Sequence, residues 1–110
     1  MSFDAYKYKF RLITSHYLVA GNKVLPRHSH AFELAVFTLS RLNGYSEDTH
    51  LEVEGIINDF LLTYEGKTLN DFPPFGEIPP TLENITKIFF QSMQKILAEH
   101  GYTLLRLEVS

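Results

Sequence analysis

The chain has 110 residues, of which 45% are apolar, a formal net charge of −3 at pH 7 and no cysteine. This length suits one domain, residues 1–110, and the lack of cysteine excludes disulfides, thiolate metal ligands and cysteine nucleophiles. The mild negative charge gives no electrostatic reason to expect a nucleic-acid partner, and without a membrane-length apolar run or a signal-peptide pattern we expect a cytoplasmic protein with no membrane partner.

Residues 6–16 alternate between two kinds of side chain. One set is mainly apolar and ends in a histidine: Tyr6, Tyr8, Phe10, Leu12, Thr14 and His16. The other set is mainly basic: Lys7, Lys9, Arg11, Ile13 and Ser15. A period of two with one charged face predicts a half-exposed antiparallel strand. The basic row favours a solvated sheet face over a phosphate-binding stripe.

A second strand is predicted over residues 28–42, after turn residues at Gly21, Asn22 and Pro26. One face carries His28, His30, Phe32, Leu34 and Val36, and the other carries Ala31, Glu33, Ala35, Phe37 and Leu39. Because both faces are largely apolar, we expect a central strand that is covered on both sides. Asn43 and Gly44 end it.

Two helices and a last strand follow. Residues 53–64 carry apolar side chains at i, i+3, i+4 and i+7, the pattern of an amphipathic helix. Its candidate N-caps are Ser46, Asp48 and Thr49, and Gly66 is its expected stop.

Residues 67–80 are expected to be irregular. Thr81 is predicted to cap a second helix that ends at Gly101. The expected inner face of this helix comprises Ile85, Ile88, Phe89, Ser92, Met93 and Ile96. Residues 102–109 are predicted to form a final strand. Strict alternation would place Leu105 and Leu107 on one face of it and Leu104 on the other. The order strand, strand, helix, helix, strand predicts an α+β domain with two helices on one face of an antiparallel sheet.

Three histidines form a candidate metal site. His28 and His30 are two residues apart in a strand, so their side chains point to the same face, and His16 can supply a third imidazole from the neighbouring strand. Three neutral imidazoles with one open position make the catalytic type of zinc site. We therefore interpret all three as zinc ligands; the alternative is that each is a solvent-facing or structural histidine.

The element order, His16, the His28–His30 pair, the segment Pro80-Thr81-Leu82-Glu83-Asn84 and a carboxylate at Glu108 together resemble the 6-pyruvoyl-tetrahydropterin synthase family over nearly the whole chain. That family includes the 6-carboxy-tetrahydropterin synthases. The resemblance implies the tunnelling fold, in which trimers close their sheets into a barrel and two trimers stack into a hexamer. It also implies a pterin-type ligand and a homo-oligomer, either a trimer or a hexamer.

The resemblance also implies roles for individual residues. The implied zinc ligands are His16, His28 and His30, and the implied substrate-binding residues are Thr81, Glu83 and Glu108. A carboxylate at Glu108 suits a pterin because two acceptor oxygens match two adjacent N–H donors of the pyrimidine edge. Alternatively, Glu108 pairs with Arg106 on the surface, and Glu83 complements a helix dipole.

The chain departs from the family at its proton-transfer groups. The cysteine, or glutamate in one subgroup, that precedes the family's paired histidines is absent from Gly21–Arg27. The family's Leu-Asp-His-Lys-x-Leu-Asn corresponds to Tyr64–Asn70, where Glu65 and Gly66 replace aspartate and histidine. A positioned base typically contributes ~10²–10⁴-fold, so normal synthase turnover is in doubt and the catalytic residues stay unknown. Candidate substitutes for the base are Glu65, Asp71 and Tyr17.

Three functions stay open from the sequence. The first is a zinc-dependent, carbon–oxygen lyase-like pterin synthase with an altered base. The second is a non-catalytic oligomer that holds a pterin or purine-like ring through Glu108. The third is a structural oligomer whose sites are vestigial. All three are oligomers, because ring closure removes the exposed edge strands of a short open sheet.

Overall fold

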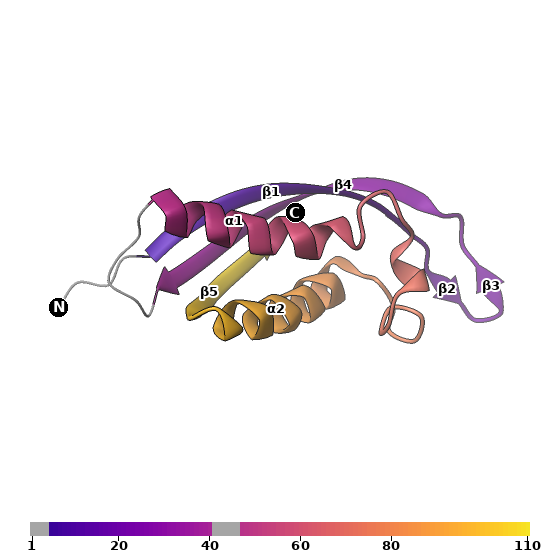
Figure 1. Ribbon diagram of the computed structural model, residues 1–110. Coiled ribbons are helices and arrows are strands. Elements are labelled where there is room, and N and C mark those ends of the chain that lie inside the picture. Colours follow the sequence, from indigo (N-terminus) through magenta and orange to yellow (C-terminus); the bar gives the residue numbers. More distant parts are fainter. Residues whose placement is uncertain (1–4, 41–46) are drawn as a thin grey trace.

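The computed structural model describes residues 5–40 and 47–110, without the side chain of Ser40. Its elements are β1 (Ala5–His16), β2 (Val19–Ala20), β3 (Lys23–Val24), β4 (His28–Ser40), α1 (Glu47–Leu62), the 3-10 helix η1 (Leu69–Asp71), α2 (Leu82–Glu99) and β5 (Tyr102–Val109). The strands β1, β4 and β5 form an antiparallel sheet in the order β1-β4-β5. Both helices lie on one side of this sheet (Figure 1). The predicted α+β class and element order are therefore confirmed.

The strand β1 shows the alternation that its sequence predicts. Tyr8, Leu12 and Thr14 are buried, whereas Lys7 and Lys9 are exposed. Side chains that point toward the helices are removed from water and those that point away remain solvated. The strand is thus half-exposed, as expected.

The strand β4 is central in the sheet, as predicted, but it is not covered on both sides. Its even-numbered residues Phe32, Leu34 and Val36 are buried against the helices. On the opposite face, Ala31 and Glu33 are exposed. The prediction of two-sided cover is wrong for a single chain, because both helices pack on the same face of the sheet.

A short hairpin between β1 and β4 was expected only as a turn. Val19 pairs with Val24 as β2 meets β3, and Gly21 adopts a positive φ of 61° in the turn between them. Figure 1 shows this hairpin at the right-hand end of the view. The hairpin joins the end of β1 that carries His16 to the start of β4 that carries His28.

The helix α1 begins at or before Glu47, so Asp48 and Thr49 lie inside its first turn and are not its N-cap. Ser46, the third candidate, lies outside the described residues, as do residues 41–44, where β4 was expected to end. The buried face of α1 consists of Val53, Ile57 and Leu61, as predicted.

The helix α2 begins as predicted. The hydroxyl of Thr81 accepts a hydrogen bond from the amide of Asn84 at 3.2 Å, and Gly101 follows the helix with a φ of 85°. The buried residues of α2 are Ile85, Phe89, Met93 and Leu97. Neither α1, α2 nor any other helix within residues 5–40 and 47–110 is long and apolar enough to cross a membrane.

A β-bulge in β5 corrects the predicted alternation of the last strand. Phe37 pairs with Arg106 but the next residue, Thr38, pairs with Leu104. The extra residue, Leu105, is exposed, and the bulge reverses the parity of the strand around it. As a result Leu104 and Leu107 are both buried, whereas strict alternation had set them on opposite faces.

Candidate metal centre and ligand groove

The pairing of β1 with β4 brings the three predicted zinc ligands together. His16 lies opposite His28, and Thr14 lies opposite His30. Because side chains alternate along both strands, all three imidazoles project from the same face as Leu12 and Phe32. His16 is half-buried, whereas His28 and His30 are exposed.

The rings are neighbours but do not converge on one point. The ring centroids of His16 and His30 are 4.7 Å apart and their planes differ by 18°, which is a stacked arrangement. The centroids of His28 and His30 are 6.3 Å apart with an interplanar angle of 65°. In the part of the chain that the structure describes, no three histidine, aspartate or glutamate side chains meet as a metal-binding group.

The donor chemistry nevertheless suits a divalent cation. Nδ1 of His16 is buried and has no hydrogen-bond partner among the described residues. Burial lowers the pKa of His16 below its ordinary value, and the neighbouring His30 and then His28 lower it further. A neutral imidazole with a free lone pair is the form that binds a metal ion, and a buried polar atom without a partner commonly indicates a missing ion or water. The three side chains therefore fit zinc in their donor chemistry and lie near one another.

The segment 65–70 runs beside the end of β1 that carries His16. The amide of Gly66 donates to the carbonyl of Ile13 at 2.7 Å, and the amide of Ser15 donates to the carbonyl of Lys67 at 2.9 Å. Ser15 and Thr68 also form a parallel bridge. The sequence indicated only irregular structure here, and no local pattern could have revealed this pairing.

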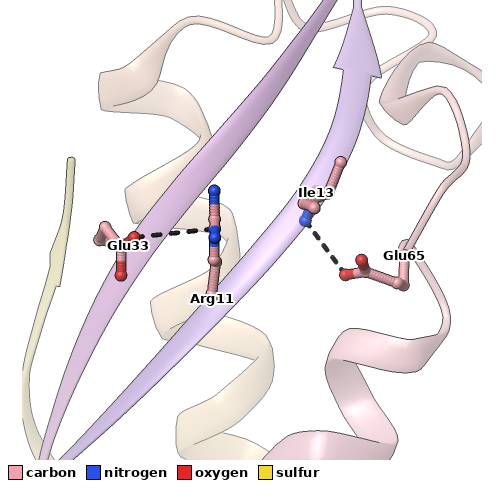
Figure 2. Close-up of polar contacts among 4 residues, drawn as sticks. All are labelled: Arg11, Ile13, Glu33 and Glu65. Atoms are coloured by element: carbon pink, nitrogen blue, oxygen red, sulfur yellow. Dashed lines mark hydrogen bonds and ion pairs between the residues drawn. The ribbon is translucent and has the colours of Figure 1, made fainter.

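The three candidate bases, Glu65, Tyr17 and Asp71, are all in or next to this region. Glu65 Oε2 accepts a hydrogen bond from the amide of Ile13 at 3.1 Å, and the carboxylate lies beside β1 in Figure 2. Tyr17 is bound through its backbone amide and carbonyl to Asn70. Asp71 is exposed. None of these contacts places an acid or base against the three histidines.

A groove between α2 and β5 contains two of the predicted substrate-binding residues. Its volume is about 830 Å³, and both Glu83 and Glu108 line it, together with Leu82, Thr86, Lys87, Phe90, Gln91, Gln94, Leu107 and Val109. Thr81 is not among the lining residues, and its hydroxyl caps α2. Glu108 also pairs with Arg106, with 2.8 Å between Glu108 Oε1 and Arg106 Nη2.

The groove and the histidines lie apart within one chain. Glu108 is opposite Ala35 on β4, which is five residues further along the strand than His30. At ~3.4 Å per residue, this separation is roughly 17 Å along β4. A ligand of pterin size cannot reach both positions within a single copy.

Glu33 lies on the side of the sheet that faces away from the histidines. Its Oε1 is 3.9 Å from Nε of Arg11, and both side chains are mostly exposed. Figure 2 shows this contact next to the Ile13–Glu65 hydrogen bond. Strand parity therefore keeps this carboxylate away from the candidate metal centre.

Comparisons with known proteins agree with this architecture. A sequence model of the family described as 6-pyruvoyl tetrahydropterin synthase matches residues 6–110. The solved structure of Caenorhabditis elegans 6-pyruvoyl tetrahydropterin synthase is similar, with a TM-score of 0.80 and 14% sequence identity over 100% of this chain and 89% of that chain. That likeness shows a shared fold. None of the curated proteins compared matches the chain significantly. Because the family model covers nearly the whole sequence, the chain belongs to the 6-pyruvoyl tetrahydropterin synthase family.

Proposed function

We propose that this protein is a cytoplasmic, zinc-binding member of its family that takes a pterin-type ligand and has little or no normal synthase turnover. The observation that carries the proposal is the register of β1 against β4, which sets His16 opposite His28 with the ring of His30 4.7 Å from that of His16. His28 and His30 are exposed, so their rings can change rotamer on a nanosecond timescale and turn toward a shared ion.

His16, His28 and His30 would hold the metal as neutral imidazoles. A zinc ion bound there would supply Lewis acidity, lowering the pKa of ligand hydroxyl groups and stabilising negative charge on oxygen. Nδ1 of His16 supports this assignment, because coordination would satisfy a buried atom that has no hydrogen-bond partner within residues 5–40 and 47–110.

Glu108 would anchor the ligand ring. Its carboxylate offers two acceptors to the paired N–H donors of a pterin, and it lines a groove of about 830 Å³. Its present partner, Arg106, forms an exposed ion pair with it, and such pairs contribute only about 0.2–1 kcal/mol. A ligand can therefore replace Arg106 at small cost. Glu83 lines the same groove, whereas Thr81 would act there only by capping α2.

We further propose that the working form is a homo-oligomer, a trimer or a hexamer. The sheet order leaves β1 and β5 at its two edges, and pairing between copies would cover these edges. Because Glu108 and the histidines lie apart in one chain, the histidines of one copy and the groove of its neighbour would together form the ligand site.

A non-catalytic binding protein is the second candidate. Oε2 of Glu65 accepts a hydrogen bond from the amide of Ile13, and Gly66 carries no side chain, so these two positions cannot act as an aspartate–histidine pair. If the protein does turn over a pterin, it would be a zinc-dependent carbon–oxygen lyase with its base elsewhere.

Metal content tests the first part of the proposal. We expect the purified protein to bind about one zinc ion per chain, and His28→Ala and His30→Ala to abolish this binding. His100→Ala is the matched control, because His100 lies at the end of α2, where its Nδ1 is 3.0 Å from the carbonyl of Ile96. Absence of stoichiometric zinc in the wild type, together with indifference of its melting temperature to chelator, would favour the structural oligomer.

Ligand binding tests the second part. With zinc present, 7,8-dihydroneopterin triphosphate should raise the melting temperature of the wild type but not that of Glu108→Ala. Glu99→Ala, at the exposed end of α2, should respond like the wild type. Stabilisation without product supports the non-catalytic alternative, and product formation supports the enzyme. An equal shift in Glu108→Ala and the wild type would remove Glu108 from the site.

A further inference from the structure

The segment 65–70 contacts β1 and also the residue that immediately precedes β4, and these two strands carry the candidate metal ligands. On β1, the hydroxyl of buried Thr14 donates to the carbonyl of Lys67 at 2.6 Å. Next to β4, Nη1 of Arg27 donates to the hydroxyl of Thr68 at 3.3 Å. Thr14 lies opposite His30, and Arg27 immediately precedes His28. The segment therefore spans the end of the β1–β4 pair at the level of the histidines.

Asn70 makes two hydrogen bonds to a single residue. Its Oδ1 accepts from the amide of Tyr17 at 3.0 Å, and its Nδ2 donates to the carbonyl of Tyr17 at 3.0 Å. Tyr17 follows His16, and the pairing of β1 with β4 ends at His16. Asn70 thus gives the chain hydrogen-bond partners just after β1 ends, where β4 no longer pairs with it.

The backbone is fixed on both sides of His16. Before it, the amide of Ser15 donates to the carbonyl of Lys67; after it, both polar backbone groups of Tyr17 bind Asn70. Asn70 is itself held firmly, because Leu69 beside it is 0% exposed and the amide of Phe72 donates to the carbonyl of Leu69 at 2.9 Å. The position of the His16 ring is therefore connected to the hydrophobic core through Asn70.

We propose that Asn70 is a positioning residue for His16 that preorganises the metal centre, an inference that rests on the proposed zinc site. Only a carboxamide offers one acceptor and one donor in this arrangement. An aspartate keeps the acceptor for the amide of Tyr17. Its second oxygen, however, would face the carbonyl oxygen of Tyr17, and two acceptors repel each other. Side chains that orient a metal ligand without touching the metal typically contribute 10–100-fold to affinity.

The test compares Asn70→Asp and Asn70→Ala with Asn58→Asp, which introduces the same charge at an exposed position on α1. Zinc affinity is measured by competition with a chromophoric chelator, and the visible spectrum of Co²⁺-loaded protein reports the coordination number. We expect both Asn70 variants to bind zinc about 10-fold or more weakly and to show a weaker, more six-coordinate Co²⁺ spectrum. Asn58→Asp should match the wild type in both measurements.

Folding is measured separately, by circular dichroism and thermal unfolding of the metal-free proteins. If the folded Asn70 variants keep the wild-type zinc affinity and Co²⁺ spectrum, the positioning role is wrong while the zinc site stands. It is also wrong if affinity falls only in proportion to the fraction of unfolded protein. If the wild type and His28→Ala both fail to bind zinc, the proposed function fails and this inference fails with it.

Discussion

The carboxylate of Glu65 accepts a hydrogen bond from the backbone amide of Ile13, across a distance of 3.1 Å (Figure 2). Ile13 lies in β1, an edge strand of the sheet, and the amide of Gly66 donates in return to the Ile13 carbonyl. Glu65 and Gly66 thus bind the backbone amide and the backbone carbonyl of Ile13. Glu65 and Gly66 therefore hold the segment 65–70 against the edge of β1.

This contact predicts different effects for two substitutions at Glu65. Glu65→Gln keeps a carbonyl acceptor and should change the free energy of unfolding by no more than about 0.5 kcal/mol. Glu65→Ala removes the acceptor and should cost about 1 kcal/mol. Urea unfolding of the metal-free proteins measures both. If the protein forms product from a pterin and Glu65→Gln abolishes this reaction at unchanged stability, Glu65 acts as a base in addition to its structural hydrogen bond.

The lowered pKa of His16 predicts how stability depends on pH. Unfolded His16 titrates near the ordinary value of 6.5, and native His16 titrates lower because of burial and of His30 and His28. Between these two pKa values the unfolded chain binds more protons, so the free energy of unfolding falls as pH drops below 6.5 and levels off below the native pKa.

Urea unfolding between about pH 5 and about pH 8 measures this dependence, because histidines titrate in that range. His16→Gln is the control that isolates this one group, and we expect a shallower slope for this variant. An identical slope in the variant and the wild type would contradict the prediction.

Much of the fold could be predicted from local patterns. The alternation of β1 and the apolar spacing of α1 and α2 depend on which side chains face the core, and this information is present within each segment. The bulge at Leu105 could not be predicted, because an extra residue in β5 is defined only by its pairing with Phe37 and Thr38. The open face of β4 was missed for a related reason: apolar residues on both faces do not say which face the helices cover.

The candidate site also contains residues that the sequence predicts and a residue that it does not. The neighbourhood of His16, His28 and His30 follows from strand parity and one hairpin, and the structure brings these residues together. Asn70 was not predicted as part of the site because it lies 53 residues from Tyr17. An asparagine in an irregular segment indicates a turn, and only the tertiary structure shows that its side chain binds the strand next to His16.

Thr81 has a structural role that its substitution would reveal. Its hydroxyl accepts from the amide of Asn84 at 3.2 Å and caps α2. Thr81→Ala should therefore cost about 1 kcal/mol of unfolding free energy, and Thr81→Asp, which keeps an N-cap acceptor, should cost far less. Zinc affinity should not change in either variant. A loss of pterin binding in Thr81→Asp at wild-type stability would instead assign the hydroxyl to the ligand site.

Two glycines should respond with opposite signs to the same substitution. Gly66 has a φ of +72°, and a Cβ there would meet no atom within 4 Å, so the cost of Gly66→Ala is conformational and not steric. A left-handed conformation costs an L-residue about 1–2 kcal/mol, and Gly66→Asn should cost less, because asparagine tolerates this region. Gly55, inside α1, also has open space around its Cβ position, but its conformation is helical. Gly55→Ala should therefore stabilise the protein by about 0.5–1 kcal/mol. Urea unfolding of the two alanine variants gives both signs, and a neutral or stabilising Gly66→Ala would show that the turn between α1 and the segment 65–70 differs in solution.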